Sequence, residues 1–144
     1  MNHRLSPRLP SLAGVLLALT ALAAPAAAQD VDCSNPTAQM EMTYCAEQDW
    51  NAADAALNAA YARAMDEMRR IDADLAGLPH LVGAVDALRA AQRAWIPYRD
   101  KACAAQGFMA RGGTMEPMLI YQCRADLTRQ RTQELEALAA GLGN

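Results

Sequence analysis

Four cysteines constrain the fold of this chain more than any other feature. They stand at positions 33, 45, 103 and 123 and follow an N-terminal segment typical of exported proteins. In an oxidising compartment such a set forms disulfides, and four cysteines allow three pairings. We expect the local pairs Cys33–Cys45 and Cys103–Cys123, each closing a loop of roughly 12 to 20 residues and contributing about 3 kcal/mol. The non-local pairings stay open, because one end of a helical bundle could hold all four cysteines.

The N-terminal segment has the three parts of a secretory signal. Arg4 and Arg8 form a positive region, residues 12–24 are apolar, and Ala26-Ala27-Ala28 is a small-residue cleavage site. We predict a signal peptide over 1–28, cleaved after Ala28, and one mature domain over 29–144 in the periplasm or secreted. A retained membrane anchor is the alternative. No later segment is long and apolar enough to cross a membrane.

The predicted mature domain is acidic. Residues 1–28 hold two arginines and no acid, so their removal changes the net charge from −3 to −5. Such a domain is a poor partner for nucleic acid or anionic lipid and suits a cationic partner. The acids concentrate between Asp30 and Asp74, where ten stand against three arginines. Solvated helix faces explain this excess, and an exposed acidic surface is the alternative.

Apolar residues recur every three or four positions along the mature chain, which predicts helices. The first helix begins at Asn35-Pro36-Thr37, where Asn or Thr can cap and Pro suits the first helical position. It ends before Gly77-Leu78-Pro79. Its apolar stripe comprises Trp50, Ala53, Leu57, Ala60, Ala64, Met68, Ile71 and Leu75.

Two more helices follow. The second runs from about 81 to 105 with a predicted kink at Pro97, and the third begins with Thr114 as its cap and frays at 141–143. The short first turn makes helices one and two antiparallel, and helix three runs beside them. The sequence thus predicts an all-α fold, a small antiparallel three-helix bundle with a long first helix and disulfides at one end. The apolar stripe of the second helix comprises Leu81, Ala84, Leu88, Ala91, Trp95, Tyr98 and Ala102.

The chain lacks the residue types of the common active sites. The only histidine outside the signal is His80, alone in a turn, so neither a His-based metal site nor a Ser-His-Asp triad can be assembled. The cysteines are not spaced as C-x-x-C, which disfavours zinc. A charged helix face explains the carboxylates better than a catalytic pair does. We predict no enzyme, metal or cofactor.

Two segments are candidates for binding. Gln92 and Arg99 flank Trp95 on the second helix. In the structural interpretation Arg99 pairs with a first-helix acid such as Asp54, and Trp95 fills the core. The alternative is a binding patch, because Trp and Arg are enriched at interface hot spots. The loop Arg111-Gly112-Gly113-Thr114 either presents residues to a partner or only connects two helices.

Four sequence blocks together resemble a known family, the lysozyme-inhibitor LprI N-terminal domain family, formerly a domain of unknown function. They span Cys33 to about Leu138, and the third block is the most specific. Two positions depart from the family pattern: Ala38 stands where Thr is frequent, and Pro97 interrupts the third block. The blocks are Cys33 with Glu41-Met42 and Cys45-Ala46; Ala53-Asp54, Leu57-Asn58 and Tyr61; Ala91-Gln92-Arg93-Ala94-Trp95-Ile96, Tyr98-Arg99-Asp100 and Cys103; and Gly112-Gly113-Thr114, Cys123, Leu127-Thr128 and Arg131-Thr132.

This resemblance implies an exported, helical, disulfide-bonded inhibitor of lysozyme. Our hypothesis is a protein that binds lysozyme-type muramidases, with Arg111 facing the acidic carboxylates of the cleft and steering supplied by the negative charge. The alternative is an envelope protein-interaction module without lysozyme inhibition. The family-motif positions, structural or binding, are Asp54, Tyr61, Gln92, Trp95, Tyr98, Arg99 and Asp100.

Overall fold

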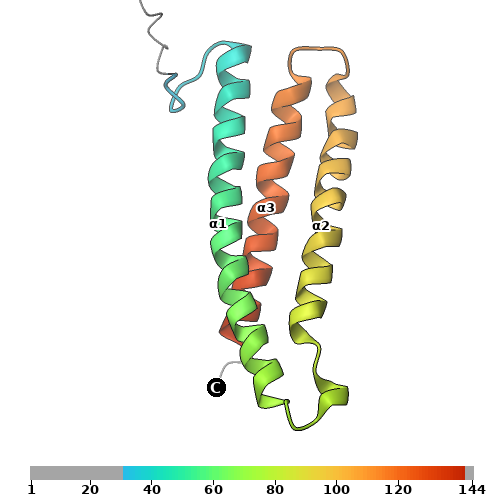
Figure 1. Ribbon diagram of the computed structural model, residues 1–144. Helices are drawn as coiled ribbons and strands as arrows, with labels where there is room; N and C mark the ends of the chain where they lie inside the picture. The colour runs from blue at the N-terminus through green and yellow to red at the C-terminus, as the bar shows by residue number, and fades with distance from the viewer. Residues whose placement is uncertain (1–30, 142–144) are drawn as a thin grey trace, which may run out of the picture.

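Three long helices make up most of the protein in its computed structural model, which describes residues 31–141. They are α1 (Gln39–Asp74), α2 (Ala84–Gly107) and α3 (Glu116–Ala140). Short 3-10 turns, η1 (Pro79–Leu81) and η2 (Phe108–Ala110), lie in the two connections. Figure 1 shows α1 and α3 running in the same direction and α2 running opposite to both. The predicted all-α three-helix fold is confirmed, and the described residues contain no strand.

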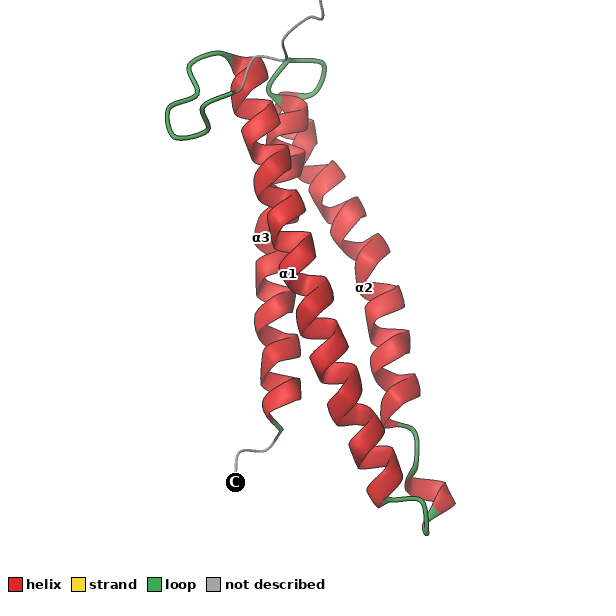
Figure 2. Cartoon of the chain, turned by 60° about the vertical axis from the view of Figure 1, so that its left-hand side comes forward, coloured by secondary structure: helices red, strands yellow, loops and turns green. Residues whose placement is uncertain are grey.

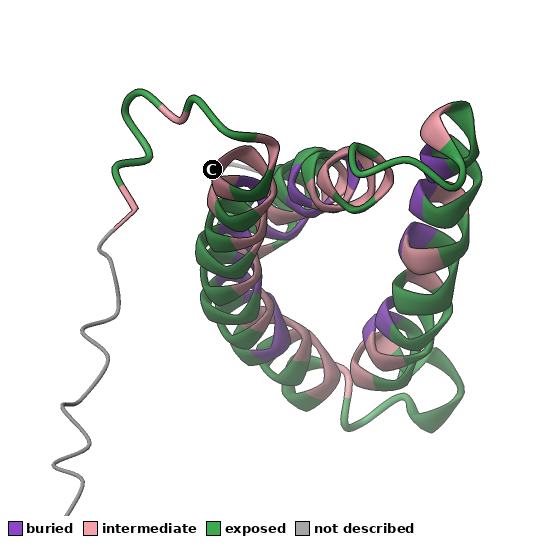
Figure 3. Ribbon diagram, turned by 90° about the horizontal axis from the view of Figure 1, so that it is seen from above, coloured by how far each residue is buried: buried purple, intermediate pink, exposed green. Residues whose placement is uncertain are grey.

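The core lies along the axis between the helices. Figure 3 shows the buried positions of each helix facing inward and the exposed ones facing outward. Small residues on α1, Ala60 and Ala64, are fully buried and let α3 pack closely against α1 over its length. Leu57, Leu88 and Leu135 bring one large apolar side chain from each helix into this core. Each of these leucines stabilises the fold by about 1.5–3 kcal/mol relative to an exposed position.

The inner face of α2 differs from the predicted stripe. Leu81, which precedes α2, and Ala91 and Tyr98 within it are exposed, whereas Gln92 and Arg99 are buried. The face that packs on the other helices consists of Leu88, Gln92, Trp95, Arg99 and Cys103, spaced three or four residues apart. The prediction holds for Leu88 and Trp95. It was wrong at Leu81, Ala91 and Tyr98, because the stripe admitted only apolar residues and a charged side chain can be buried when it has partners. Pro97 lies on the exposed side, and α2 is helical on both sides of it.

Two predicted helix caps are also wrong. α1 begins at Gln39 with Ala38 at its N-cap, so neither Asn35 nor Thr37 caps it. Instead the Glu41 carboxylate reaches back and accepts hydrogen bonds from the backbone N–H groups of Thr37 at 2.9 Å and Ala38 at 3.1 Å. α3 begins after Met115 rather than after a Thr114 cap. In both cases a glutamate in the first helical turn reaches back and accepts hydrogen bonds from backbone N–H groups that lie before the helix.

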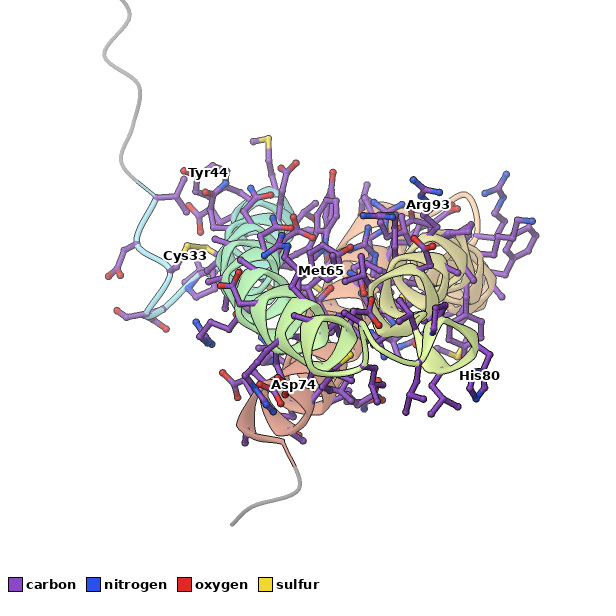
Figure 4. The ribbon with its side chains drawn as sticks, turned by 60° about the horizontal axis from the view of Figure 1, so that its bottom comes forward. Cys33, Tyr44, Met65, Asp74, His80 and Arg93 are labelled. Carbon is purple, nitrogen blue, oxygen red and sulfur yellow. A yellow bond between two sulfur atoms is a disulfide. The ribbon has the colours of Figure 1, made fainter. Side chains whose placement is uncertain are left out.

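At the opposite end, Asp72 of α1 caps α2. Its carboxylate accepts hydrogen bonds from the backbone N–H groups of Gly83, Ala84 and Val85 at 2.8, 2.8 and 3.1 Å. These amides have no partner inside α2, so Asp72 satisfies them and ties the turn to α1. His80 lies exposed in η1, as Figure 4 shows from this end.

The predicted signal peptide over 1–28 lies outside the described residues. Within residues 31–141, none of the helices combines the length and the apolar character that a membrane span requires.

Candidate partner-binding site

Both disulfides lie at the end of the bundle where α1 and α3 begin and α2 stops. They join Cys33 to Cys45 and Cys103 to Cys123, with sequence separations of 12 and 20 residues and Cα–Cα distances of 5.4 Å. Figure 2 shows that the segment before α1 and the α2–α3 connection share this end, away from the α1–α2 turn. The disulfides therefore fix the two irregular segments of this end to the helices.

Close helix packing fixes the base of the α2–α3 connection as well. Gly107, the last residue of α2, is buried against Ile120 of α3. A Cβ atom at Gly107 would lie 2.7 Å from Ile120 Cγ1, so a side chain there would force the Ile120 side chain or the helices to shift. Glycine and the buried Cys103–Cys123 disulfide together hold α2 and α3 close where the loop between them starts.

The loop itself is ordered by Glu116. The Glu116 carboxylate accepts hydrogen bonds from the backbone N–H of Gly112 at 2.9 Å and from the Arg111 guanidinium at 2.5 Å. The Gly112 amide, and after it Arg111, lower the pKa of Glu116 from its ordinary value, so this carboxylate is anionic at neutral pH. Gly112 has φ of +80°, a conformation that glycine adopts without steric cost.

Arg111 is therefore not a free cation at the tip. Besides its bond to Glu116, its guanidinium carbon lies 4.7 Å from the centroid of the Phe108 ring. The side chain remains 64% exposed, so a partner can still reach it. The loop thus presents an ordered surface in which a positive group is already paired within the chain.

The exposed apolar side chains at this loop were missed by the sequence analysis. Phe108 is 62% exposed and Met109 74% exposed, and Met115 is also exposed. Large apolar side chains clustered on a surface are typical of interaction sites. The signal was present in the sequence, because Phe108 is the only phenylalanine and lies beside the Gly-rich segment.

The family-motif residues meet in a different place, inside the bundle. The Arg99 guanidinium lies 3.1 Å from carboxylate oxygens of both Asp54 on α1 and Asp100 on α2. It also lies over the Trp95 ring and the Trp50 ring, with centroid distances of 5.1 and 5.4 Å. The structure thus contains the Arg99–Asp54 pair of the structural interpretation. Arg99 is only 6% exposed, so its contacts serve the packing of the three helices.

Helix α3 completes this interior cluster with residues that the sequence analysis did not single out. Arg124 lies 3.3 Å from Asp100 and stacks over Trp50 at 4.8 Å, and Tyr121 stacks on Trp50 with centroids 5.8 Å apart. Burial raises the pKa of the Tyr121 phenol, and the neighbouring Glu47 carboxylate adds to this effect. Two guanidinium groups therefore share one carboxylate, Asp100, between α2 and α3.

The other motif residues divide between core and surface. Gln92 is buried and accepts a hydrogen bond from Arg131 of α3 at 3.1 Å. Tyr61 packs against the core near Met65, which Figure 4 shows between the helices. Tyr98 points away from the cluster and is exposed. No group of three or more potential metal-binding side chains occurs in the described part of the chain.

The protein is thus a small helical domain with two disulfides, a charged interior cluster and an ordered loop that exposes apolar side chains. A family model described as "Lysozyme inhibitor LprI" matches residues 33–135. An uncharacterised protein of Rhizobium meliloti (strain 1021) is 46% identical over 135 residues, which cover 92% of this chain and 97% of that protein. The chain belongs to the LprI lysozyme inhibitor family. No solved structure matches it.

Proposed function

We propose that this protein is exported and inhibits lysozyme-type muramidases. The observation that carries the proposal is the family match, which covers almost all of the described domain. The family is one of inhibitors rather than enzymes. The two disulfides support an oxidising compartment, the periplasm or the exterior, and so does the signal-like segment at 1–28.

In our proposal the segment from Gly107 to Glu116 is the part that enters the muramidase cleft. Its support is the order of the loop: the Cys103–Cys123 disulfide fixes its base and Glu116 fixes its tip. A preorganised loop loses little conformational entropy on binding. The candidate contact residues are Arg111, Gly112, Gly113 and Thr114. On binding, the Arg111 guanidinium would leave Glu116 and pair with carboxylates of the cleft.

The first experiment measures peptidoglycan lysis by a C-type and a g-type lysozyme in the presence of disulfide-intact residues 29–144, at low and physiological salt. Dose-dependent inhibition that weakens with salt supports the proposal, since muramidases are commonly cationic and this domain is acidic. Inhibition of neither enzyme rejects it and favours an envelope interaction module without lysozyme inhibition.

The second experiment tests the loop. Arg111→Gln removes the loop cation, and we expect at least a tenfold loss of inhibition. Arg89→Gln is the matched control, because Arg89 is a half-exposed arginine that is also paired with a carboxylate, Asp86, but lies toward the opposite end of α2. Equal inhibition by both variants and the parent domain would remove Arg111 from the proposed contact.

A further inference from the structure

A groove lies beside the loop, between the first turns of α1 and the start of α3. One wall consists of α1 residues, among them Met40 and Tyr44, and the other consists of Thr114 and Pro117. Its volume is about 660 Å³. Met40 is 82% exposed, and Tyr44 is also exposed, so two large apolar side chains stand at its edge. We call this feature the α1–α3 groove, lined by Gln39, Met40, Thr43, Tyr44, Glu47, Thr114 and Pro117.

The surroundings of the α1–α3 groove are acidic. Residues 31–62 contain five carboxylates and neither lysine nor arginine. Asp49 and Asp54 are paired with Arg129 and Arg99. The other three, Asp32, Glu41 and Glu47, form no ion pair within residues 31–141. Glu47 lines the groove itself, so the apolar surface lies beside a carboxylate that has no ion-pair partner within the described residues.

Two of these carboxylates, Asp32 and Glu41, have a lowered pKa and keep their charge at neutral pH. The backbone N–H groups of Ala38 and Thr37 lower the pKa of Glu41, and Ser34 lowers the pKa of Asp32 through its hydroxyl and its backbone amide. Neither interaction brings in a positive charge. A cationic group on a partner would therefore be the first ion-pair partner of Asp32 and Glu41.

We propose that the α1–α3 groove docks a basic protein surface, in which an apolar side chain flanked by lysine or arginine enters between Met40 and Pro117. The inference rests on the proposed function, because it names the muramidase as this partner and the groove as a second contact beside the loop. Methionine adapts its shape readily and suits such a contact. A second copy of this chain does not fit, because a two-fold interface would bring the same carboxylates face to face.

The test measures the affinity of the disulfide-intact domain for a C-type lysozyme by titration calorimetry at low salt. Met40→Lys replaces a largely exposed apolar residue with a cation, and we expect at least tenfold weaker binding. Leu81→Lys makes the same chemical change at an exposed residue of the opposite end and should leave affinity within about twofold. Thermal unfolding of each variant verifies that the fold is intact.

A second pair of variants isolates the charge. Glu47→Gln keeps the shape of the groove and removes one of its carboxylates, so we expect several-fold weaker binding and a shallower dependence on salt. Asp66→Asn removes one exposed carboxylate from the same helix outside the groove and should change little. If lysozyme binds the parent and all four variants equally, the groove proposal is overturned while the proposed function stands.

A peptide probe separates the two proposals when lysozyme does not bind. A synthetic amphipathic peptide of leucine and lysine is titrated into the ¹⁵N-labelled domain, with a leucine–glutamate peptide of equal length as control. The groove proposal expects amide shifts at Met40, Tyr44 and Thr114 for the lysine peptide only. Shifts elsewhere, no shifts, or equal shifts with the glutamate peptide contradict it, whatever the outcome of the lysis assay.

Discussion

Arg99 and Arg111 each pair with a carboxylate and lie over an aromatic ring, yet their surroundings differ. The Arg99 side chain is 7% exposed and bridges Asp54 and Asp100, whereas the Arg111 side chain is 64% exposed and bonds to Glu116 within its own loop. Buried charges are costly to leave unpaired, and exposed pairs contribute little to stability. The same pair of chemical groups therefore holds the bundle together in one region and shapes a surface in the other.

This difference changes the meaning of the family motif. The most specific block of the sequence contains Arg99 and Asp100. With Asp54 and Trp50 of α1 and Arg124 of α3, they form a cluster inside the protein that joins all three helices. The buried contacts of Arg99 belong to the packing of the three helices. Residues that contact a partner belong at the surface, where Phe108, Met109 and Met40 are exposed. A search for binding residues in this family should begin with the loop and the α1–α3 groove.

The largest expected effect comes from replacing each arginine by methionine, which keeps the apolar stem and removes the charge. Arg99→Met leaves Asp54 and Asp100 with a weaker set of partners inside the bundle, and we expect it to lower the free energy of unfolding by about 3 kcal/mol. Arg111→Met should barely change stability. Urea titrations of both variants measure the two free energies of unfolding. Similar decreases would show that burial of the arginine does not determine how much it stabilises the fold.

The two disulfides give an effect of similar size. Replacing Cys103 and Cys123 by alanine removes the disulfide at the base of the loop. Replacing Cys33 and Cys45 by alanine removes the disulfide at the start of α1. Loss of either disulfide should lower the free energy of unfolding by about 3 kcal/mol, because the unfolded chain gains conformational entropy. The loss should be slightly greater for the longer loop, Cys103–Cys123. Cys103 is also fully buried, so its loss leaves unfilled space in the packing.

The functional readout of these variants should differ more than their stability does. At a temperature where both remain folded, inhibition of lysozyme should fall further for the Cys103/Cys123 variant, because the proposed contact loop loses its fixed base. Circular dichroism melting defines that temperature, and the lysis assay measures the inhibition. A larger loss for the Cys33/Cys45 variant would shift the proposed contact toward the start of α1.

The sequence predicted the helices well because their period and their turns are local signals. Leu57, Ala60 and Ala64 of the predicted α1 stripe are all buried. The α2 face was displaced by one residue, with Tyr98 predicted inside and Arg99 found there. Hydropathy alone does not place a guanidinium in the core. The Arg99–Asp54 pair followed instead from the chemistry of the two side chains, although they lie 45 residues apart in sequence.

The helix starts show a second limit of local signals. Asn35, Thr37 and Thr114 have the right chemistry for caps, but a backbone N–H donates its hydrogen bond to whichever oxygen lies within reach. Glu41 and Glu116 supply it from inside the following helix, and Asp72 supplies it to α2 from another helix. The loop at 111–114 was correctly located by its glycines. Its internal order depends on Glu116, which no turn signal marks.

The smallest expected effect is a dependence of stability on pH that distinguishes the two ends. Backbone N–H groups of Gly83, Val85 and Ala84 lower the pKa of Asp72 below its ordinary 3.8. At the other end, the Gly112 amide lowers the pKa of Glu116 below its ordinary 4.5. A carboxyl group with a lower pKa in the folded state contributes its full stability at neutral pH. That contribution is lost as the pH falls through the folded-state value.

Asp72→Asn should therefore reduce the fall in Tm between pH 7 and pH 3 by a few degrees. Asp86→Asn is the matched control, because Asp86 also lies in the first turn of α2 but bonds only to the side chain of Arg89 among the described residues. Scanning calorimetry across this pH range gives both profiles. If Asp72→Asn follows the wild-type profile while Glu116→Gln flattens it, acid acts on the loop end rather than on the α1–α2 turn. The two ends of the bundle would then differ in acid sensitivity as they differ in exposure.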